Sequence, residues 1–409
     1  MTSRTTGPVD SLLTQAAARV TLSAASRIRV GNLTVKLPDG TTRVFGDRAS
    51  TLRGKIHIHD LEALRRLLIG GEVGGGEAYM DGLWSSPDLV GLISMAVANR
   101  EGLALSKGWW RAPAKVARTV AHRRNRNTRT GSRRNITAHY DLGNEFYRLW
   151  LDETMTYSSA VFESPQQSLA DAQRNKYRAM AERAGVKAGD HVLEIGTGWG
   201  GMALYLAGEI GARVTTATIS QAQHDLARER IHEAGLDDIV EVQLRDYREL
   251  SGQYDAVVSI EMLEAVGHRF LDGFFATVDR VLRPGGGVAL QTITIPDQVY
   301  DRYRRGTDWI RDYIFPGGHL PSLGAIQDSL AKRTGLVVER LDDMSLDYAE
   351  TLHLWRTRFH SAESRVRELG FDDRFIRIWD FYLATCEAAF RDRQIGVLQL
   401  GLLRSGRGG

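Results

Sequence analysis

The sequence predicts an α/β fold in which a Rossmann-like parallel sheet follows a small α+β domain. Apolar, β-branched strand segments alternate with helix-like segments from about residue 136 onward, and a glycine-rich turn follows the first of these strands. Such alternation is typical of a parallel sheet with helices on both faces. A chain of 409 residues, 43% of them hydrophobic, is long enough for two domains with separate cores.

Residues 1–101 are predicted to form the small α+β domain. GNLTVKLPDGTTRVFGD alternates like a hairpin around a Pro-Asp-Gly turn, and GKIHIHD is a further strand segment. LEALRRLLIGG follows as a short helix that Asp60 would cap and that glycines would end. We expect this domain to serve lipid interaction or dimerisation, and the sequence leaves a homo-oligomer open.

The segment 102–135 is predicted to be a basic linker. Between Gly102 and Tyr140 the chain has ten Lys or Arg, no Asp or Glu, and the pair Trp109 and Trp110. Such a run is often a solvated linker, and the alternatives are contact with nucleic acid or with an anionic membrane surface. The basic residues are Lys107, Arg111, Lys115, Arg118, Arg123, Arg124, Arg126, Arg129, Arg133 and Arg134.

Residues 136–409 are predicted to form the main domain. Its strands are HVLEIG, ARVTTATI, IVEVQLRD, YDAVVSI and GGVALQTITI, with helices at QAQHDLARERIHEAG and FLDGFFATVDRVL. Ligands of such sheets bind at the carboxyl ends of the strands. VLEIGTGWGG, residues 192–201, places its turn at that end of the first strand, so we expect the ligand there.

Cysteine and hydropathy patterns exclude several classes of protein. The single cysteine, Cys386, excludes an internal disulfide framework and a cysteine-built metal site, and it fits a reducing cytosol. No apolar run approaches the roughly 18 residues of a membrane span, and the N-terminus lacks a signal-peptide core. His139, His319 and His353 lack metal-ligand spacing, so no metal is expected. We expect a cytoplasmic protein.

The residues around the glycine turn limit the kinds of ligand that it could bind. Gly196, Gly198 and Gly201 match G-x-G-x-x-G, which alone is a weak signal. A nicotinamide site needs an acidic residue about 20 positions later, but the second strand ends in TATISQAQ, and the Gly-Lys-Ser/Thr of a P-loop is missing. Glu194 can orient the turn and receive the ammonium of an amino-acid-like ligand. Close backbone approach at Gly196 and Gly198 suits a ligand without phosphates, which favours S-adenosylmethionine.

Several motifs resemble the cyclopropane fatty acid synthase family: VLEIGTGWGG, TISQAQ, RDY, EMLEAVG, YIFPGGHLPS, HYDLGNEFY and TYSSAVF. GEAYMDGLW at 76–84 resembles the N-terminal domain of that family, so the resemblance covers nearly the whole chain. It implies a class I methyltransferase fold and S-adenosylmethionine-dependent methylation of cis double bonds in acyl chains of membrane phospholipids or related lipids.

The resemblance also implies the cofactor contacts. Tyr157 and Ser158 match the pair near the methionine end, and Gly196 and Gly198 match the loop beneath the cofactor. The remaining matches are Thr218, Ile219 and Gln223 at the ribose and Asp246 and Tyr247 at the adenine.

Alkene methylation leaves a carbocation, which aromatic faces can stabilise, and a base must then remove a proton. In well-known members the base is bicarbonate, and the resemblance places its cage at Ser159, Glu264, Gln291, Ile293 and Tyr348. Ser159 stands where those members have cysteine and Gln291 where they have histidine, and Glu261 adds a carboxylate. Either bicarbonate still binds, or a carboxylate of the protein replaces it, with Glu145, Glu261 and Glu264 as candidates.

These departures resemble the tuberculostearate-type branch, which forms a 10-methylene group from an oleoyl chain. A separate, flavin-dependent reductase would then act on the product, and a cyclopropane product is the alternative. We expect the basic segment to bind an anionic phospholipid surface on the inner face of the membrane. Two rival hypotheses are a small-molecule or nucleic-acid methyltransferase and a lipid-binding protein with an inactive catalytic domain. No N-P-P-Y-type motif supports nucleic acid, and the intact cofactor residues disfavour inactivity.

Overall fold

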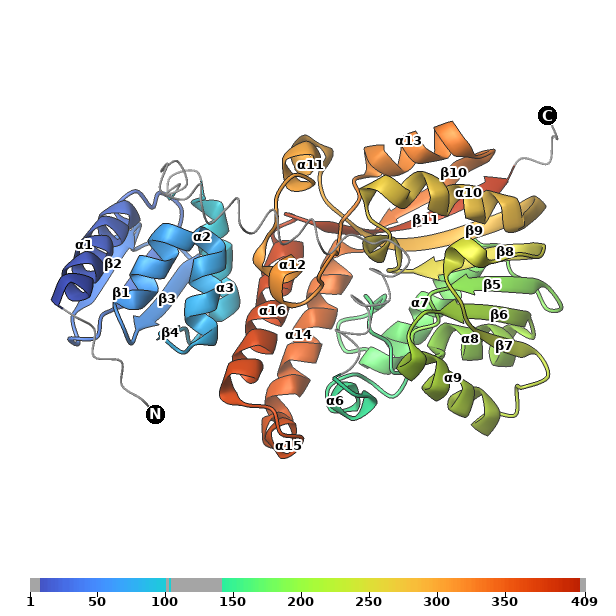
Figure 1. Ribbon diagram of the computed structural model, residues 1–409, viewed down its shortest axis with the longest axis horizontal. Helices are drawn as coiled ribbons and strands as arrows, with labels where there is room; N and C mark the ends of the chain where they lie inside the picture. The colour runs from blue at the N-terminus through green and yellow to red at the C-terminus, as the bar shows by residue number, and fades with distance from the viewer. Residues whose placement is uncertain (1–7, 101–102, 104–141, 405–409) are drawn as a thin grey trace. The chain divides into compact units, whose positions relative to one another are not determined.

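The computed structural model of the chain describes residues 8–100, 103 and 142–404 (Figure 1). Most of the predicted basic linker therefore lies outside the described residues. The chain divides into two compact units. The described residues of the small unit fall within Met1–Ala121, Thr307–Ile314 and Glu363–Asp392, and those of the large unit within His122–Gly306, Phe315–Ala362 and Arg393–Gly409.

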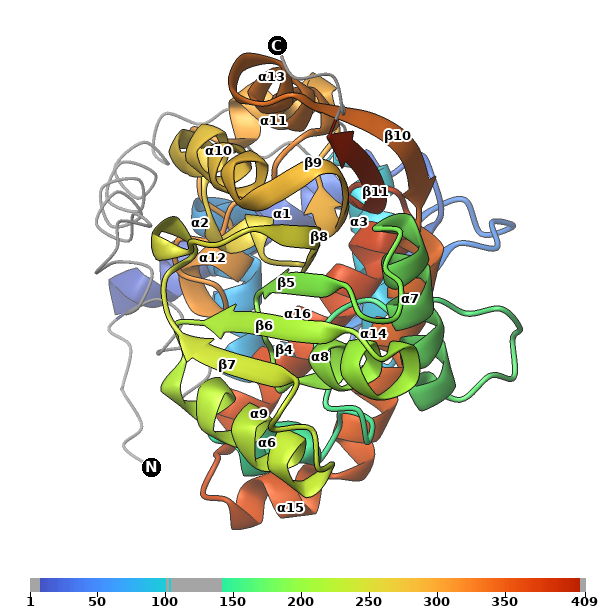
Figure 2. The same ribbon diagram turned by 90° about the vertical axis from the view of Figure 1, so that its right-hand side faces the viewer.

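The large unit is built on a seven-stranded sheet with the order β10-β11-β9-β8-β5-β6-β7 (Figure 2). Every neighbouring pair is parallel except the two pairs that β11 forms, with β9 and with β10. The strands are β5 (His191–Ile195), β6 (Arg213–Thr218), β7 (Val240–Leu244), β8 (Tyr254–Ile260), β9 (Leu282–Thr294), β10 (Leu336–Asp343) and β11 (Gly396–Arg404).

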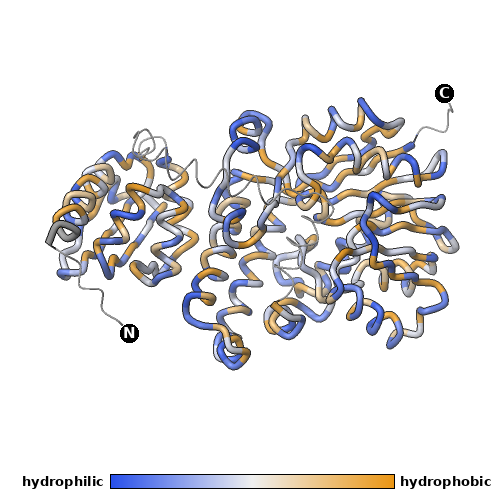
Figure 3. The backbone as a smooth tube through the Cα atoms, viewed as in Figure 1, coloured by the Kyte–Doolittle hydropathy of each residue, from blue (hydrophilic) through white to orange (hydrophobic). Residues whose placement is uncertain are grey.

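Helices cover both faces of this sheet, as the strand–helix alternation predicted. One apolar core joins the sheet to α10 (Leu271–Val281) and α13 (Leu323–Arg333). The other joins it to α7 (Leu169–Arg183), α8 (Gly201–Tyr205) and α9 (Gln221–Glu233). Hydrophobic residues run along the central strands in Figure 3. The unit also contains α6 (Asn144–Arg148), α11 (Asp297–Tyr303) and α14 (Ser345–Ser361).

The small unit has a four-stranded sheet with the order β2-β1-β3-β4. The predicted hairpin forms, since β1 (Asn32–Lys36) pairs antiparallel with β2 (Thr42–Gly46), and β3 (Arg53–Ile58) lies parallel to β1. β4 (Trp84–Ser85) completes the sheet, with α1 (Pro8–Ala25) and α3 (Leu89–Ala98) in the same unit.

The helix predicted to end at glycines is longer than expected. Asp60 accepts the amide of Glu62 at 2.8 Å, but the N-cap position is Leu61 and not the predicted Asp60. α2 (Glu62–Met80) continues through the glycines and is only interrupted at Gly71, where φ is +61°. Glycine adopts this backbone conformation at little cost, so it kinks the helix and a second helical segment follows.

The division into units also differs from the predicted domain boundaries. The small unit includes α12 (Trp309–Tyr313), α15 (Glu363–Glu368) and α16 (Asp373–Arg391), which lie within the predicted 136–409 domain. Aromatic packing explains this, because the Phe381 ring lies 4.8 Å from Trp309 and 5.5 Å from Tyr79, centroid to centroid. The Tyr79 hydroxyl also donates to Asp380. The order of elements along the sequence did not indicate that these later helices belong to the small unit.

Candidate active site

The strand order reverses direction around β5, which lies between β8 and β6. In open α/β sheets, ligands bind outside the carboxyl ends of the strands at such a switch point. Glu194 lies near the end of β5, and Glu261 directly follows β8. Two sequence-predicted acidic residues thus belong to the two strands that meet at the expected ligand site.

The turn after β5 has the backbone shape that required glycine. φ is +102° at Gly196, +51° at Gly198 and +87° at Gly200. The amides of Gly196 and Thr197 both donate to the Ala217 carbonyl, at 3.0 and 3.3 Å, which holds the turn against β6. A Cβ built on Gly198 meets no atom within 4 Å. The turn therefore leaves open space beside its backbone, which fits a closely bound cofactor.

Glu194 is buried, with 2% of its surface exposed. The Thr216 hydroxyl lies 2.5 Å from its Oε2. Burial raises the pKa of Glu194 to about 8, while the Thr216 hydrogen bond and the charge of Lys176 oppose that rise. A cationic group of a bound ligand nearby would favour the ionised form of this carboxyl group.

The TISQAQ segment forms a capped helix start after β6. Ser220 Oγ accepts the Gln223 amide at 3.3 Å, and Thr218 Oγ1 donates to Gln223 Oε1 at 2.9 Å. Ile219, between the two polar residues, is half-buried. This pairing fixes the side chains predicted at the ribose.

After β7, Asp246 and Tyr247 have different environments. Asp246 accepts from the Arg248 amide at 3.0 Å and from its Nε at 2.9 Å. The Tyr247 ring is in the core, 5.5 Å from Phe274 between centroids. The prediction that these two residues contact adenine stays a prediction, and the ring of Tyr247 is engaged in packing.

Tyr157 belongs to a cluster of aromatic side chains in the large unit. Its ring lies 5.6 Å from Tyr147, 5.4 Å from Trp150 and 5.3 Å from Trp355, between centroids. Phe315 lies 6.5 Å away. The sequence prediction named Tyr157 but not its partners, of which Trp355 and Phe315 come from segments far away in the chain. Such a cluster can face a carbocation with several π-systems.

Glu261 accepts hydrogen bonds from three of the groups predicted to hold bicarbonate. Its Oε1 accepts from the Ser159 amide at 2.8 Å and from Gln291 Nε2 at 2.9 Å. Its Oε2 accepts from the Tyr348 hydroxyl at 2.8 Å. Burial raises the pKa of Glu261, and these three donors together with Lys176 counteract the rise. The Ser159 hydroxyl instead donates to the Ala160 carbonyl at 3.1 Å.

A chain of side chains outside the site orients Gln291. Arg183 Nη2 donates to Gln399 Oε1 at 3.1 Å, and Gln399 Nε2 donates to Gln291 Oε1 at 2.8 Å. Arginine can only donate, so Gln399 must turn its oxygen to Arg183 and its nitrogen to Gln291. Gln291 must then turn its own nitrogen to Glu261. Sequence reasoning missed Gln399, which only the pairing of β9 with β11 brings opposite Gln291.

Glu264 contacts different groups from Glu261. Its Oε1 accepts from the Ile293 amide and from Thr292 Oγ1, the latter at 3.0 Å. Its Oε2 is buried and has no hydrogen-bond partner among the described residues. Burial, and then the charge of Glu261, raise the pKa of Glu264 to about 8. A neutral Glu264 beside an ionised Glu261 avoids two like charges at one site.

Two further residues singled out from the sequence have environments unlike that of a catalytic base. The Glu145 side chain is 71% exposed and pairs with Arg148 on its own short helix at 2.9 Å, so the expectation of an enclosed base does not hold for it. Cys386 lies on α16 in the small unit. The residue is half-buried, and desolvation raises the pKa of its thiol to about 12, which agrees with its interpretation as an unreactive side chain.

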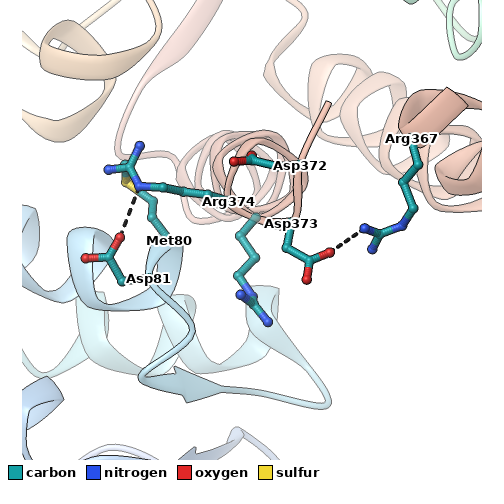
Figure 4. A pocket seen from close by; sticks show the side chains of 7 residues that line it. Met80, Asp81, Arg367, Asp372, Asp373 and Arg374 are labelled. Atoms are coloured by element: carbon teal, nitrogen blue, oxygen red, sulfur yellow. Dashed lines mark hydrogen bonds and ion pairs between the residues drawn. The ribbon is translucent and has the colours of Figure 1, made fainter. Parts of the chain in front are cut away.

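An open pocket in the small unit does not resemble a cofactor site. It has a volume of about 600 Å³ and is lined by charged side chains (Figure 4). Arg374 pairs with Asp81 at 3.0 Å, and Arg367 pairs with Asp373. Because these side chains form ion pairs with one another, the pocket offers no support for placing the cofactor there.

Within the described part of the chain, no group of His, Cys, Asp and Glu side chains could hold a metal ion. None of its helices combines the length and apolar character needed to cross a membrane.

Comparison with known proteins identifies the family. A family profile described as mycolic acid cyclopropane synthetase matches residues 127–400. The chain belongs to this family. It is 42% identical over 377 residues to a tuberculostearic acid methyltransferase of Mycobacterium tuberculosis, covering 90% of this chain and 87% of that protein. It is 36% identical over 352 residues to a cyclopropane-fatty-acyl-phospholipid synthase of Escherichia coli, covering 84% and 86%.

The fold agrees with this assignment. A mycolic acid cyclopropane synthase crystallised with S-adenosylhomocysteine and CTAB matches with a TM-score of 0.62 and 29% identity, over 66% of this chain and 98% of that one. The chain is therefore an S-adenosylmethionine-dependent methyltransferase of the class I fold. The predicted family, fold class and cofactor are confirmed.

Proposed function

We propose that this enzyme methylates the cis double bond of oleoyl chains in membrane phospholipids and leaves a 10-methylene group. The observation that carries the proposal is the position of the Glu261 carboxylate, which accepts from Ser159, Gln291 and Tyr348. In resembling enzymes those positions hold bicarbonate. The name of the 42% identical relative, a tuberculostearic acid methyltransferase, supports the same product class.

The proposed chemistry balances with one released proton. The bound cofactor supplies an electrophilic methyl group on sulfur. The double bond attacks this methyl, so a C–C bond forms at C10 of the acyl chain, the sulfur–methyl bond breaks and C9 becomes positive. A hydride shift from C10 to C9 moves the charge to C10. The base then takes a proton from the new methyl group, and the electron pair of that C–H bond forms the methylene double bond to C10.

Glu261 is suited to take that proton. A carboxylate offers about four lone-pair sites, and three are occupied by the donors described above, so one remains. The aromatic cluster around Tyr157 would stabilise the carbocation by about 2 kcal/mol or more when water is excluded. A base already fixed in the site needs no recruited ion. This is the physical reason to favour Glu261 over bicarbonate.

We assign the cofactor to the carboxyl ends of β5, β6 and β7. Glu194, Gly196 and Gly198 would hold its methionine part together with Tyr157 and Ser158. The ribose would lie at Thr218, Ile219 and Gln223 and the adenine near Asp246 and Tyr247. The support is the open space beside Gly198 and the preset Thr218–Gln223 pair.

The substrate lies in a membrane, so we propose peripheral attachment to an anionic surface on the cytoplasmic side. The support is the sequence of the basic segment, whose ten cationic residues and two tryptophans suit a lipid headgroup region. A 10-methylene product would be the substrate of a separate, flavin-dependent reductase. The oligomeric state stays open.

Mass spectrometry of total fatty acids tests the product, in a host that makes oleoyl phospholipids and expresses this chain. Each product adds one CH₂ unit, so derivatisation must distinguish a methylene branch from a ring. A methylene group at C10 is expected. A cyclopropane would return this chain to the function named for its Escherichia coli relative.

A further inference from the structure

Lys176 is a buried cation that no step above uses. It lies on α7 with 0% of its surface exposed, and its Nζ donates to Ser158 Oγ at 2.7 Å. Three residues earlier on the same helix, Gln173 is equally buried and donates from Nε2 to the Ser158 carbonyl at 3.0 Å. α7 therefore holds both the side chain and the backbone of Ser158.

The chemistry of these groups determines the direction of the hydrogen bond. In its protonated form Lys176 can only donate, so the Ser158 hydroxyl then accepts from it. The serine then keeps its own proton for another acceptor. Within the described part of the chain, no protein group accepts that proton. Ser158 is 95% buried, since only 5% of its surface is exposed, so a further acceptor at this position would be enclosed.

The charges that face Lys176 come from three other segments. Glu261 follows β8, Glu194 lies on β5 and Asp152 precedes both in the chain. None of them forms an ion pair with Nζ among the described residues, and on α7 itself Nζ lies 5.0 Å from the Tyr177 ring centroid. Burial lowers the pKa of Lys176 to about 7, and the three carboxyl groups oppose this. A buried cation without a close anion is costly, so a bound carboxylate nearby would offset that cost.

Building on the proposed cofactor site, we propose that Lys176 is a positioning residue for the carboxylate of the methionine part of S-adenosylmethionine. Lys176 acts through Ser158: it makes Ser158 Oγ an acceptor, and the Ser158 proton donates to the cofactor carboxylate. Its charge offsets that of the carboxylate. The next residue, Ser159, donates its amide to Glu261. One short segment thus aligns the cofactor with the base.

Calorimetric titration of the full chain with two ligands tests this role. S-adenosylhomocysteine carries the carboxylate, whereas 5′-methylthioadenosine has the same nucleoside and thioether but no amino-acid part. Lys176→Met should weaken S-adenosylhomocysteine binding roughly tenfold or more, as expected for a lost charge-assisted hydrogen bond. It should leave methylthioadenosine binding within about twofold. Equal weakening of both ligands would mean a merely structural lysine, and no weakening of either would equally overturn the inference.

A second variant keeps the test decisive if Lys176→Met does not fold. Ser158→Ala retains the lysine and removes the hydroxyl, and it should show the same selective loss. The double variant should be no weaker than the weaker of the two single variants, because both act on one interaction. Lys332→Met, whose side chain is 63% exposed on α13, is the control and should bind both ligands normally. Neither ligand reacts, so the result does not depend on which lipid product forms.

Discussion

The Tyr348 hydroxyl donates to Oε2 of Glu261 at 2.8 Å and so connects α14 to the carboxyl end of β8. Glu261 has φ of +50°, which is uncommon for a residue other than glycine. Such a conformation costs about 1–3 kcal/mol and persists where the surroundings hold it. Here the Glu261 amide donates to the Gln291 carbonyl at 2.7 Å. The carboxylate is thus held from both its backbone and its side chain.

Glu261→Gln should lower kcat by at least ~100-fold, because an amide cannot accept the proton from the alkylated chain. Affinity for S-adenosylmethionine should stay within a few-fold. Transfer of a labelled methyl group to oleoyl phospholipid vesicles measures the rate, and wild-type activity should be insensitive to depletion of bicarbonate.

Glu145→Gln is the matched control and should retain near-wild-type activity, since that carboxylate is exposed and paired with Arg148. Strict dependence of the wild type on bicarbonate together with a cyclopropane product would contradict a base supplied by the protein. So would full activity of Glu261→Gln.

Gln399→Leu should move the acid limb of the kcat–pH profile to higher pH. Gln399 fixes the amide of Gln291, whose Nε2 donates to Glu261. A donor stabilises the ionised carboxylate, so loss of its orientation raises the pKa of Glu261 and more of the base is protonated at low pH. Gln327→Leu, an exposed change on α13, is the control. A loss of activity that is equal at every pH would refute the orienting role.

Local pattern was enough to predict the elements of the parallel sheet. HVLEIG and YDAVVSI became β5 and β8 at the expected places, because their apolar runs are buried on both faces. The antiparallel strand β11 and its partner β10 were not predicted. β11 pairs with segments far away in the sequence, and the alternation of strands with helices cannot predict such a pairing. The inclusion of α16 in the small unit was missed for the same reason.

The candidate site shows a similar contrast. Motif spacing located the glycine turn, and the family resemblance pointed to Glu261. The structure brings Ser159, Gln291 and Tyr348 together around that carboxylate. Sequence alone could not choose among three glutamates, because exposure decides that choice and exposure depends on tertiary packing. Lys176 carried no motif signal at all, since a lysine on a helix is ordinarily solvated.

Gly196→Val should abolish measurable cofactor binding. Gly196 has φ of +102°, which a β-branched residue does not adopt without strain, and its Cβ would lie 3.4 Å from Met262. The turn would have to shift into the space assigned to the cofactor. Calorimetry with S-adenosylmethionine provides the measurement.

The control for that change is Gly235→Val, which also has a positive φ, +68°, but meets no atom within 4 Å. This control variant should have a lower free energy of unfolding but an unchanged affinity for S-adenosylmethionine. An unchanged affinity for S-adenosylmethionine in a folded Gly196→Val variant would show that this turn does not bind the cofactor.

Replacing Arg123, Arg124, Arg126 and Arg129 with Ser should weaken binding to anionic vesicles at low salt by several hundred-fold or less. Each basic residue near such a surface contributes up to about 1 kcal/mol, and this decreases over a Debye length. These four residues lie outside the described part of the chain, so the prediction rests on sequence alone. Sedimentation with vesicles measures it, and wild-type binding should weaken as salt rises. Equal binding to neutral and anionic vesicles would argue against electrostatic attachment.

Glu264→Gln should stabilise the protein increasingly as pH rises from 5 to about 8. The folded-state pKa of Glu264, about 8, lies above its ordinary value of 4.5 because of burial and the charge of Glu261. Its stability contribution is therefore fully present below pH 4.5 and is lost as pH rises through 8. Glutamine cannot ionise, so the variant avoids this loss, which is on the order of a few kcal/mol.

Urea unfolding of the wild type and of Glu264→Gln at pH 5, 7 and 9 gives the difference in unfolding free energy at each pH. That difference should grow in favour of the variant mainly between the two pKa values, 4.5 and about 8, and should level off above pH 8. Glu339→Gln, an exposed change on β10, should leave its own difference nearly constant. If the Glu264→Gln difference is independent of pH, the buried carboxyl is already ionised at neutral pH. Glu264 would then compete with Glu261 for the role of base.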